Sequence, residues 1–400
     1  MTEGRALASV AFRGQAVVAG VGESTYYRHG GSPDSEFVLL VKAVRAACAD
    51  AGVPPSHVDG FCSYGNDRNG PVRLANALGV RDLAVSVMQW EGGGGGMAAA
   101  IMNAAMAVAT GHARCVAAFR GLAQGQYGRF GVARGGGEVY GAAAYQQPYG
   151  VVTPGQMYAL KFVRWMHEHG GAGLAAQKAV SLASYRHAQR NPRATMYGKP
   201  LTSAAYDASR MIVEPWRLYD FCQENDGAAA VIVTHADRAA DLPNRPVHIL
   251  AAAQGAYQSA GRAGFNETPY ASAGFTTVAP RLWAGAGVGP MDVDVVQSYE
   301  NFTGGVVMSL VEHGMVDPEA VDEVLTLDNL SAPHGRIPLN TSGGNLAEAY
   351  IHGFNLAVEG VRQLRGTSSN QVADCHVALV SAGPLTTPVS SLLLGTEEAL

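Results

Sequence analysis

The sequence is organised around residues 340–353, which read N-T-S-G-G-N-L-A-E-A-Y-I-H-G. The paired glycines form a turn, and the apolar spacing after them predicts a helix over residues 346–364. Free backbone N–H groups at the start of such a helix can bind an anionic or carbonyl oxygen. The stretch also places two polar side chains, Tyr350 and His352, close to the turn. It is either a surface turn or a site, depending on which other segments meet it.

The composition is that of a globular, mildly acidic protein. The 400 residues are 48% hydrophobic and 15% charged, which suits two ordinary domains or one large α/β unit. A formal net charge of −5 argues against a general nucleic-acid binder. Residues 1–12 lack the basic start and apolar run of a signal peptide, and no apolar stretch reaches the roughly 20 residues of a membrane helix. We therefore expect a cytoplasmic protein with no membrane span.

Cysteine and histidine spacing argues against a metal centre. No C-x-x-C pair occurs among the five cysteines, which are Cys48, Cys62, Cys115, Cys222 and Cys375. We expect them to be reduced core thiols. His334, His352 and His376 also lack the spacing of metal ligands. The sequence therefore predicts no metal site.

Apolar segments alternate between strand and helix patterns, and the order repeats. The first part predicts strands at 16–20, 58–64, 83–90 and 115–119, and helices at 36–51 and 97–110. The last part predicts strands at 247–252, 293–298, 375–380 and 390–394, and helices at 279–286 and 301–314. Each part has a glycine turn that opens a buried helix before a late strand. This order indicates an internal duplication of a layered α/β unit.

Residues 121–215 interrupt the pattern with many aromatic side chains. Two helices, at 154–168 and 172–189, are predicted within them. Long excursions are often caps or binding loops, but the aromatics could equally form the excursion's own small core. Residues 225–227 then predict a turn into a strand at 228–234. We therefore divide the chain into an N-terminal half, 1–238, that contains this insertion, and a C-terminal half, 246–400.

Two further segments could carry chemistry. Tyr299 follows a predicted strand, and its phenol can donate a hydrogen bond, act as a general acid or base, or simply belong to the core. The glycine run 92–96 lacks the Lys-Ser/Thr of a P-loop and the spacing of a dinucleotide fingerprint. It also contains no Cys or Ser nucleophile. It suits a close-packed helix start with room for a ligand backbone or thioester.

Over most of the chain, the order of segments resembles the thiolase superfamily, in its sterol-carrier-protein (lipid-transfer-protein) branch. The resemblance rests on residues 97–111, Asn191-Pro192, Asn225-Asp226-Gly227-Ala228-Ala229, Tyr299-Glu300-Asn301-Phe302 and Asn340-Thr341-Ser342-Gly343-Gly344. It implies an α/β fold of two duplicated halves in α-β-α-β-α layers, with an inserted loop region. It also implies a homodimer whose twofold axis lies near the buried glycine-to-helix segment.

The chain departs from the thiolase pattern at each catalytic position. The nucleophilic Cys of thiolases, just before the buried helix, falls near Gly94. Tyr299 stands where the family has His or Asn, and Tyr350 stands where it has the catalytic His. The second Cys, from a C-x-G motif, falls on Ser381, two residues before Gly383. We therefore do not expect Claisen chemistry.

The paired tyrosines resemble the thiolase-like aldolases of steroid side-chain degradation, in which two tyrosines are regarded as the acid and the base. That group works with a small partner protein that contains a zinc ribbon and an OB-like domain. The resemblance implies retro-aldol cleavage of a β-hydroxy acyl-CoA, such as a steroid 17-hydroxy-20-carboxyl-CoA, to a 17-ketosteroid and propionyl-CoA. Tyr299 and Tyr350 would transfer the protons, in either order. Backbone amides near Gly94 and at Gly383 would hold the thioester oxygen.

Supporting roles would fall to His352, which tunes or orients Tyr350, and to Asn301 and Gly344. No cofactor is implied, because acyl-CoA is the substrate.

One alternative is a non-catalytic subunit that binds acyl-CoA or sterol, although a binder does not need hydroxyls at both former catalytic positions. Another is a thiolase-like subunit that processes an aromatic succinyl-CoA, although that chemistry would want the missing Cys.

Overall fold

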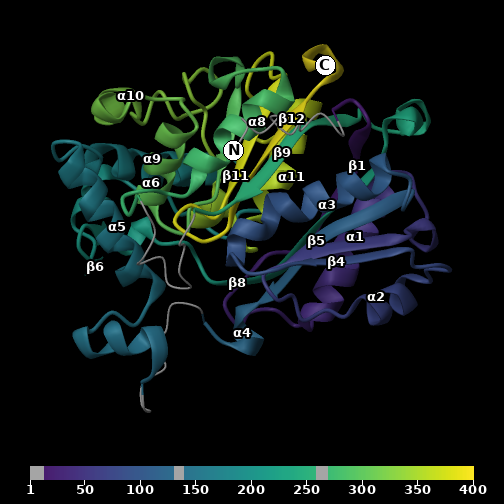
Figure 1. Ribbon diagram of the computed structural model, residues 1–400, viewed down its shortest axis with the longest axis horizontal. Helices are drawn as coiled ribbons and strands as arrows, with labels where there is room; N and C mark the ends of the chain where they lie inside the picture. Colours follow the sequence, from purple (N-terminus) through teal and green to yellow (C-terminus); the bar gives the residue numbers. More distant parts are fainter. Residues whose placement is uncertain (1–12, 130–138, 258–268) are drawn as a thin grey trace, which may run out of the picture.

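The computed structural model describes residues 13–129, 139–257 and 269–400 (Figure 1). Within these ranges ten strands form one mixed sheet, in the order β10-β11-β12-β9-β1-β8-β5-β3-β4, with β2 paired to β8 beside this path. The predicted absence of a signal peptide concerns residues 1–12, which lie outside the described residues. Residues 130–138 of the predicted insertion lie outside them as well.

The first half of the sheet is built from β1 (Ala16–Glu23), β2 (Tyr27–Arg28), β3 (Gly60–Tyr64), β4 (Val85–Gln89), β5 (Cys115–Ala123) and β8 (Asn225–His235). Helices α1 (Glu36–Asp50) and α2 (Pro71–Leu78) pack on one face of it. Helix α3 (Met97–Ala109) packs on the other face. The alternation of side chains along each strand separates these two cores. Helix α2 was not predicted from the sequence.

The second half of the sheet is built from β9 (Val247–Gly255), β10 (Val295–Ser298), β11 (Val377–Ala382) and β12 (Val389–Gly395). Its outer face packs against α5 (Pro154–Glu168), α6 (Leu174–Ala188), α8 (Ala279–Ala286) and α9 (Thr303–Glu312). Its inner face packs against α11 (Phe354–Arg365) and α3. The two halves join where β9 pairs with β1 at Val17–His248 and Val18–Val247.

The halves repeat one topology. The order β9-β12-β11-β10 in the second half matches β1-β8-β5-β3 in the first half. Helices α3 and α11 share the core between the half-sheets, and α3 is rich in alanine where it is buried. In Figure 1, α5, α6 and α9 lie on the side away from α1 and α2. The prediction of a layered α/β fold is confirmed, while the proposed domain boundaries stay a prediction.

The predicted helix over residues 346–364 is wrong in its first part. A single π turn, η10 (Gly344–Glu348), follows the paired glycines, and α11 begins only at Phe354. Between them the chain leaves the right-handed helical region, with φ values of 52° at His352 and 86° at Gly353. The apolar residues before and after the break are all buried, so their spacing in the sequence resembles that of one continuous helix. Tyr350 therefore lies in a break and not on a helix.

The predicted turn at residues 225–227 is also wrong, because these residues are the first of β8. Asp226 pairs with Tyr27 of β2 and with Ala123 of β5. Asn and Asp favour turns because their side chains can bond nearby backbone. Here the Asp226 carboxylate instead accepts a hydrogen bond from Gly125 N (2.8 Å), on a distant segment. A long-range contact therefore overrides the local turn preference.

The insertion contains α5 and α6, and their ends lie within two residues of the predicted ones. Its smaller elements are α4 (Gln124–Tyr127), α7 (Ser203–Asp207) and β6 (Met211–Val213). Strand β7 (Trp216–Arg217) follows directly, and α10 (Val321–Val324), in the C-terminal half, packs against α6. Of its aromatics, Tyr140, Tyr145 and Tyr149 are exposed, whereas Trp165 is buried. A binding role for the exposed side chains stays a prediction. Trp216, just after the insertion, is also buried and stacks on Phe302 with centroids 4.7 Å apart. The buried group supports the segment that follows Tyr299.

No helix in the described parts of the chain combines the length and apolar character required to cross a bilayer.

Candidate active site

Tyr299 and Tyr350 meet in the core between the two half-sheets. Their Oη atoms are 2.6 Å apart, and one phenol donates a hydrogen bond to the other. The side chains are buried, with residue exposures of 2% and 5%. Their rings are edge-to-face, with centroids 6.0 Å apart. The structure therefore brings together the two residues that the sequence singled out as catalytic.

The end of β10 holds Tyr299 in place. The amide of Tyr299 donates to Ser381 O of β11 (2.9 Å). On the other side, the Asn340 side chain accepts from Ser298 N and donates to Ser298 O, both at 2.8 Å. Residues 338–340 thus lie along the edge of β10 that faces away from β11, where Leu339 forms a parallel bridge with Val296. Tyr299 lies at the edge where parallel strands end, a usual place for sites in α/β folds.

The break before α11 holds Tyr350 in place. Tyr350 N donates to the Asn225 side-chain oxygen (2.7 Å) at the start of β8. Two residues earlier, the buried Glu348 carboxylate accepts from Asn191 Nδ2 (2.9 Å) and Ser342 Oγ (2.6 Å). Asn191 and Asn225 belong to segments on which the family resemblance rests, and neither residue had a predicted role. Their side chains fix the backbone that carries Tyr350.

Gly94 lies directly beneath the Tyr299 ring. A Cβ atom added to Gly94 would overlap the Oη and Cζ atoms of that ring. A Cβ on Gly353, at the start of α11, would overlap the same ring on another side. No side chain fits at position 94 while Tyr299 keeps this place. The glycine at position 94 and the phenol of Tyr299 therefore depend on each other.

Gly383 packs against the same glycine run. A Cβ on Gly383 would overlap the backbone of Gly95, and the φ of Gly383 is 68°. Asn301 Nδ2 donates to Pro384 O (3.2 Å), so the segment after Tyr299 holds the turn that carries Gly383. The structure places Gly383 beside the run that contains Gly94. Their role in holding a thioester oxygen stays a prediction.

Gly344 makes room for a buried carboxyl group that sequence reasoning missed. A Cβ on Gly344 would overlap the Glu300 carboxylate. That group accepts hydrogen bonds from Asn345 N (3.0 Å) and Ser184 Oγ (3.4 Å). Burial raises the pKa of Glu300 to about 8, despite these bonds. Glu300 is therefore mostly protonated at neutral pH, directly after Tyr299 in the chain.

His352 is a buried neighbour of both tyrosines. Its ring centroid lies 5.8 Å from that of Tyr350 and 6.4 Å from that of Tyr299, and it stacks on Tyr64 at 5.6 Å. Burial lowers the pKa of His352 well below its usual value, and the charges of Arg120 and Arg68 lower it further. His352 is therefore neutral at neutral pH.

Burial raises the pKa of both tyrosines well above the usual value. Their mutual hydrogen bond raises the pKa of Tyr299 and lowers that of Tyr350. Both phenols are consequently neutral before a substrate binds.

Cys222 is a further neighbour that sequence reasoning did not identify. It is partly buried, and its amide donates to Asn301 O (3.1 Å). Cys222 interacts electrostatically with both tyrosines, and burial raises the pKa of its thiol. Its only signal in the sequence was its place three residues before Asn225.

All five cysteines are free, and four of them are buried, which confirms the prediction of reduced core thiols except at Cys222. Across residues 13–129, 139–257 and 269–400, no three His, Cys, Asp or Glu side chains are grouped as a metal site requires. The site described above consists of neutral phenols, a neutral imidazole, a protonated carboxyl group and close-packed glycines. It can move protons, and Gly94 offers no side chain beside the Tyr299 ring.

Comparison with known proteins identifies relatives over nearly the whole chain. Residues 249–396 match the family model described as "Thiolase C-terminal domain-like". The chain is 39% identical over 396 residues to the 17-hydroxy-3-oxo-4-pregnene-20-carboxyl-CoA lyase of Mycobacterium tuberculosis, covering 96% of this chain and 99% of the relative. It is 36% identical over 398 residues to the steroid side-chain-cleaving aldolase of Thermomonospora curvata, covering 96% and 98%.

Solved structures show the same relationship. The Ltp2-ChsH2(DUF35) aldolase superposes with a TM-score of 0.88 at 35% identity, covering 96% of this chain and 99% of that one. Human mitochondrial 3-ketoacyl-CoA thiolase superposes with a TM-score of 0.68 at 15% identity, covering 97% and 100%. The second likeness concerns the fold alone. The prediction of a thiolase fold is confirmed.

Proposed function

The chain belongs to the family of thiolase-like, steroid side-chain-cleaving aldolases, and we propose on this premise that it is a retro-aldolase acting on a β-hydroxy acyl-CoA of the steroid 17-hydroxy-20-carboxyl-CoA type. The products are a 17-ketosteroid and propionyl-CoA. The observation that carries the proposal is the 2.6 Å contact between the Oη atoms of Tyr299 and Tyr350. It puts two phenols in contact beside Gly94, near which the resemblance places the thiolase nucleophile.

The reaction needs proton transfer and no covalent intermediate. A base removes the proton of the tertiary alcohol, and the bond between the carbinol carbon and the α-carbon of the thioester breaks. The electron pair of that bond passes into the thioester enolate, which an acid then protonates at the α-carbon. One proton leaves the substrate and one returns, so no oxidant or other reactant is required. Two neighbouring phenols can supply both steps.

The surrounding residues have roles that follow from their contacts. The amides near Gly94 and at Gly383 would donate to the thioester oxygen as negative charge develops there. His352 orients and shields Tyr350, and it stays neutral. Asn301 holds the Gly383 turn, and Gly344 admits the Glu300 carboxyl group beside the 340–350 loop. No cofactor has a part in this scheme.

A small partner protein with a zinc ribbon and an OB-like domain is part of the proposal. The support is the structural neighbour, whose name pairs Ltp2 with ChsH2(DUF35). We expect this chain to co-purify with a small zinc-ribbon protein of this kind when the two are co-expressed. Recovery of the chain alone after co-expression, at protein concentrations well above micromolar, would count against a stable complex.

A cytoplasmic location also belongs to the proposal, supported by the free thiols.

A homodimer is proposed through strand β4, the end of the sheet path. Val87 and Met88 on this strand are 36% and 37% exposed, and Trp90 just after it is 82% exposed. An exposed apolar edge strand is a ready surface for pairing with another strand. Light scattering after size-exclusion chromatography should give twice the chain mass, and Val87→Lys with Trp90→Glu should give one chain mass. An unchanged mass in this double variant would contradict pairing through β4.

The test of function uses the purified protein with its partner and a steroid β-hydroxy acyl-CoA. We expect ketone and propionyl-CoA to form together, and Tyr299→Phe and Tyr350→Phe each to lose about 100-fold or more in kcat. Tyr185→Phe is the matched control, because Tyr185 is equally buried but packs against Tyr219. Near-full activity in both site variants would remove the catalytic assignment. Unchanged acyl-CoA with the wild type would favour the non-catalytic binding subunit.

A further inference from the structure

A buried glutamine lies directly after strand β5, outside the machinery described above. Gln124 follows the last residue of that strand and is 1% exposed. Within residues 13–129, 139–257 and 269–400, neither Nε2 nor Oε1 of its side chain has a hydrogen-bond partner. A buried amide that is left unpaired destabilises a fold, because the group has given up its bonds to water. Such a group in a native protein requires an explanation.

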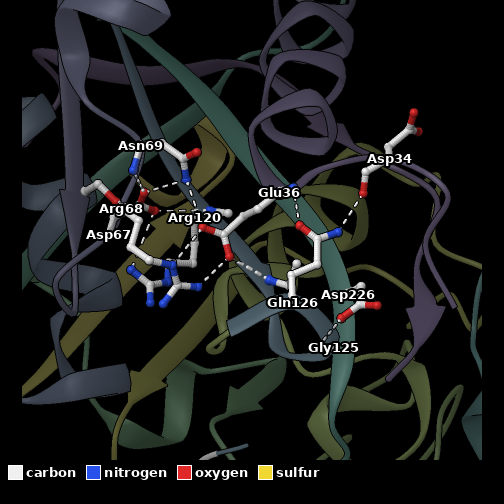
Figure 2. Close-up of polar contacts among 12 residues, drawn as sticks. Asp34, Glu36, Asp67, Arg68, Asn69, Arg120, Gly125, Gln126 and Asp226 are labelled. Atoms are coloured by element: carbon white, nitrogen blue, oxygen red, sulfur yellow. Dashed lines mark hydrogen bonds and ion pairs between the residues drawn. The ribbon is translucent and has the colours of Figure 1, made fainter. Parts of the chain in front are cut away.

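The backbone around Gln124 is held by its neighbours and not by its own side chain. Gly125 N donates to the Asp226 carboxylate (2.8 Å), and the Gln126 side chain accepts from Glu36 N (3.0 Å). Figure 2 shows these bonds joining α4 to the starts of β8 and α1. Gln124 therefore sits in a fixed segment, and its carboxamide takes no part in fixing it.

Strand alternation directs Gln124 toward the core that contains the tyrosine pair. Leu122 belongs to the same core as Tyr350, between the two half-sheets, whereas Phe119 belongs to the core under α1. Ala123 has φ −123° and ψ 86°, so the chain stays extended between Leu122 and Gln124. Successive side chains of an extended chain point to opposite faces. Gln124 is therefore on the same face as Leu122, which is the face of the site.

The neighbouring strand places Asn225 beside Gln124. In the antiparallel register of β5 and β8, Ala123 pairs with Asp226. One step further along this register, Gln124 lies opposite Asn225. Opposite residues on one face have Cβ atoms about 5 Å apart. Asn225 accepts from Tyr350 N (2.7 Å), so Gln124 lies next to the break that carries Tyr350.

This position is on the opposite side of the tyrosine pair from the glycines. Gly94 lies beneath the Tyr299 ring, and Gly383 packs on the same glycine run, so the proposed place of the thioester oxygen is on the Tyr299 side. Tyr350, by contrast, is held from the start of β8. A substrate that spans the pair therefore extends its carbinol half toward β8 and β5. Gln124 is the unpaired polar side chain at that end.

We propose that Gln124 is a substrate-binding residue, whose Nε2 donates a hydrogen bond to the oxygen that begins as the tertiary hydroxyl and ends as the ketone. The inference rests on the proposed function and deepens it by naming the group that recognises the carbinol half of the substrate. A carboxamide N–H can donate to a hydroxyl oxygen and to a ketone oxygen alike, so the bond persists through the cleavage. Gln124 binds this oxygen and transfers no proton.

The test measures binding of the ketone product, which requires no turnover. The full chain with its partner is titrated with the 17-ketosteroid, and with an analogue that has a methylene group in place of the ketone. Gln124→Met should weaken binding of the ketone about tenfold and leave binding of the analogue almost unchanged. Equal effects on the two dissociation constants would overturn the inference.

Thermal unfolding without ligand separates a binding role from a structural one. Gln124→Met removes an unpaired buried amide and keeps the length of the side chain, so the Tm should not fall. Gln124→Leu also lacks both polar atoms and gives the same comparison if the methionine variant does not fold. A clear fall in Tm for both variants would show that the amide supports the fold, and would overturn the inference.

Gln126→Met is the matched control, because Gln126 lies in the same helix, is exposed and forms bonds at both ends of its amide. It should lower the Tm and change the binding of both ligands by one factor. A loss specific to the ketone in this control would contradict the assignment to Gln124. Cleavage by the wild type without a ketone-specific loss in Gln124→Met would refute this inference alone. The converse result, a ketone-specific loss in a protein that cleaves nothing, would refute the proposed function alone.

Discussion

The two glycine turns that open the buried helices have opposite roles. The run at 92–96 leads straight into α3, and its glycines leave space beneath the Tyr299 ring. The turn at 343–344 leads into one π turn and then into a break, and α11 starts only at Phe354. The first turn leaves space for the Tyr299 ring, and the second leads into the break that carries Tyr350. The two topologically equivalent helix starts therefore contribute different parts of the site.

The contrast between the two turns explains how a site forms without a side chain at Gly94. A phenol at Tyr299 fills the space that a side chain at Gly94 would need. The break before α11 then brings Tyr350 to 2.6 Å from it. Neither change alone produces the pair. Substitutions can first fill the space at Gly94, then loosen the break before α11, and then remove contacts around the two.

Gly94→Ala should have the largest effect, because its Cβ would overlap the Oη and Cζ atoms of Tyr299. Overpacking of this kind typically lowers stability by about 1–3 kcal/mol, and displacing a catalytic phenol should reduce kcat by about 100-fold. Thermal unfolding and steady-state kinetics measure the two effects. Gly70→Ala is the control, because nothing lies within 4 Å of its added Cβ. Wild-type kinetics in Gly94→Ala would mean that Tyr299 does not need that space.

Asn225→Ala should loosen the break, because it leaves the buried amide of Tyr350 without its 2.7 Å acceptor. An unsatisfied buried donor costs about 1–3 kcal/mol, and we expect kcat to fall about tenfold with a smaller change in KM. Asn225→Asp keeps the acceptor oxygen but loses the donor to Tyr27 O (3.1 Å), so it should recover only part of the activity. Asn244→Ala, at an exposed asparagine, controls for general loss of an amide. Equal losses from Asn225→Ala and Asn225→Asp would contradict this role.

Glu300→Gln should change the pH dependence of stability more than stability itself. The folded-state pKa of Glu300, about 8, lies above its ordinary value of 4.5, so the folded state favours the protonated form. Stability from this group is therefore complete below pH 4.5 and falls as pH rises toward 8, by up to about 1.4 kcal/mol per pH unit. The glutamine variant should lose less stability than the wild type between these pH values. Urea unfolding at several pH values measures the slopes, with exposed Glu168→Gln as control. Identical slopes would show that Glu300 is already ionised.

Tyr64→Phe should have the smallest effect, although Tyr64 contacts both the first glycine turn and the break before α11. Its Cβ limits the space at Gly96, and its Oη donates to His352 O (2.8 Å). Loss of one such bond should lower the free energy of unfolding by about 1 kcal/mol, with a several-fold fall in kcat. Exposed Tyr140→Phe is the control and should change neither quantity. A fall as large as that of Tyr350→Phe would instead place Tyr64 in the proton transfer.

Local sequence patterns predicted most of the fold and only part of the site. Helices α5 and α8 have the bounds that apolar spacing predicted, because each buries one continuous face within a single segment. The break at residues 349–353 was missed because Asn225 and Asn191, far away in sequence, hold it. Glu300, Cys222 and Gln124 were missed for the same reason. Their burial and neighbours depend on how the two halves meet, which no local pattern records.

The resemblance located Tyr299 and Tyr350, but only the fold shows that they touch. Their positions, 51 residues apart in sequence, carried no distance information. The glycines at 94 and 353 explain the contact, since each removes a side chain from the Tyr299 ring. From the sequence those glycines indicated close packing without indicating what packs there.

The central claim, that the paired phenols transfer the protons of the cleavage, can be tested most directly in deuterated water. The wild type with its partner should convert the steroid β-hydroxy acyl-CoA to propionyl-CoA that carries one solvent deuterium at the α-carbon, measured by mass spectrometry. Tyr299→Phe and Tyr350→Phe should each form this labelled product at least about 100-fold more slowly. Unchanged acyl-CoA from the wild type, or equal rates of labelled product in all three proteins, would contradict the account.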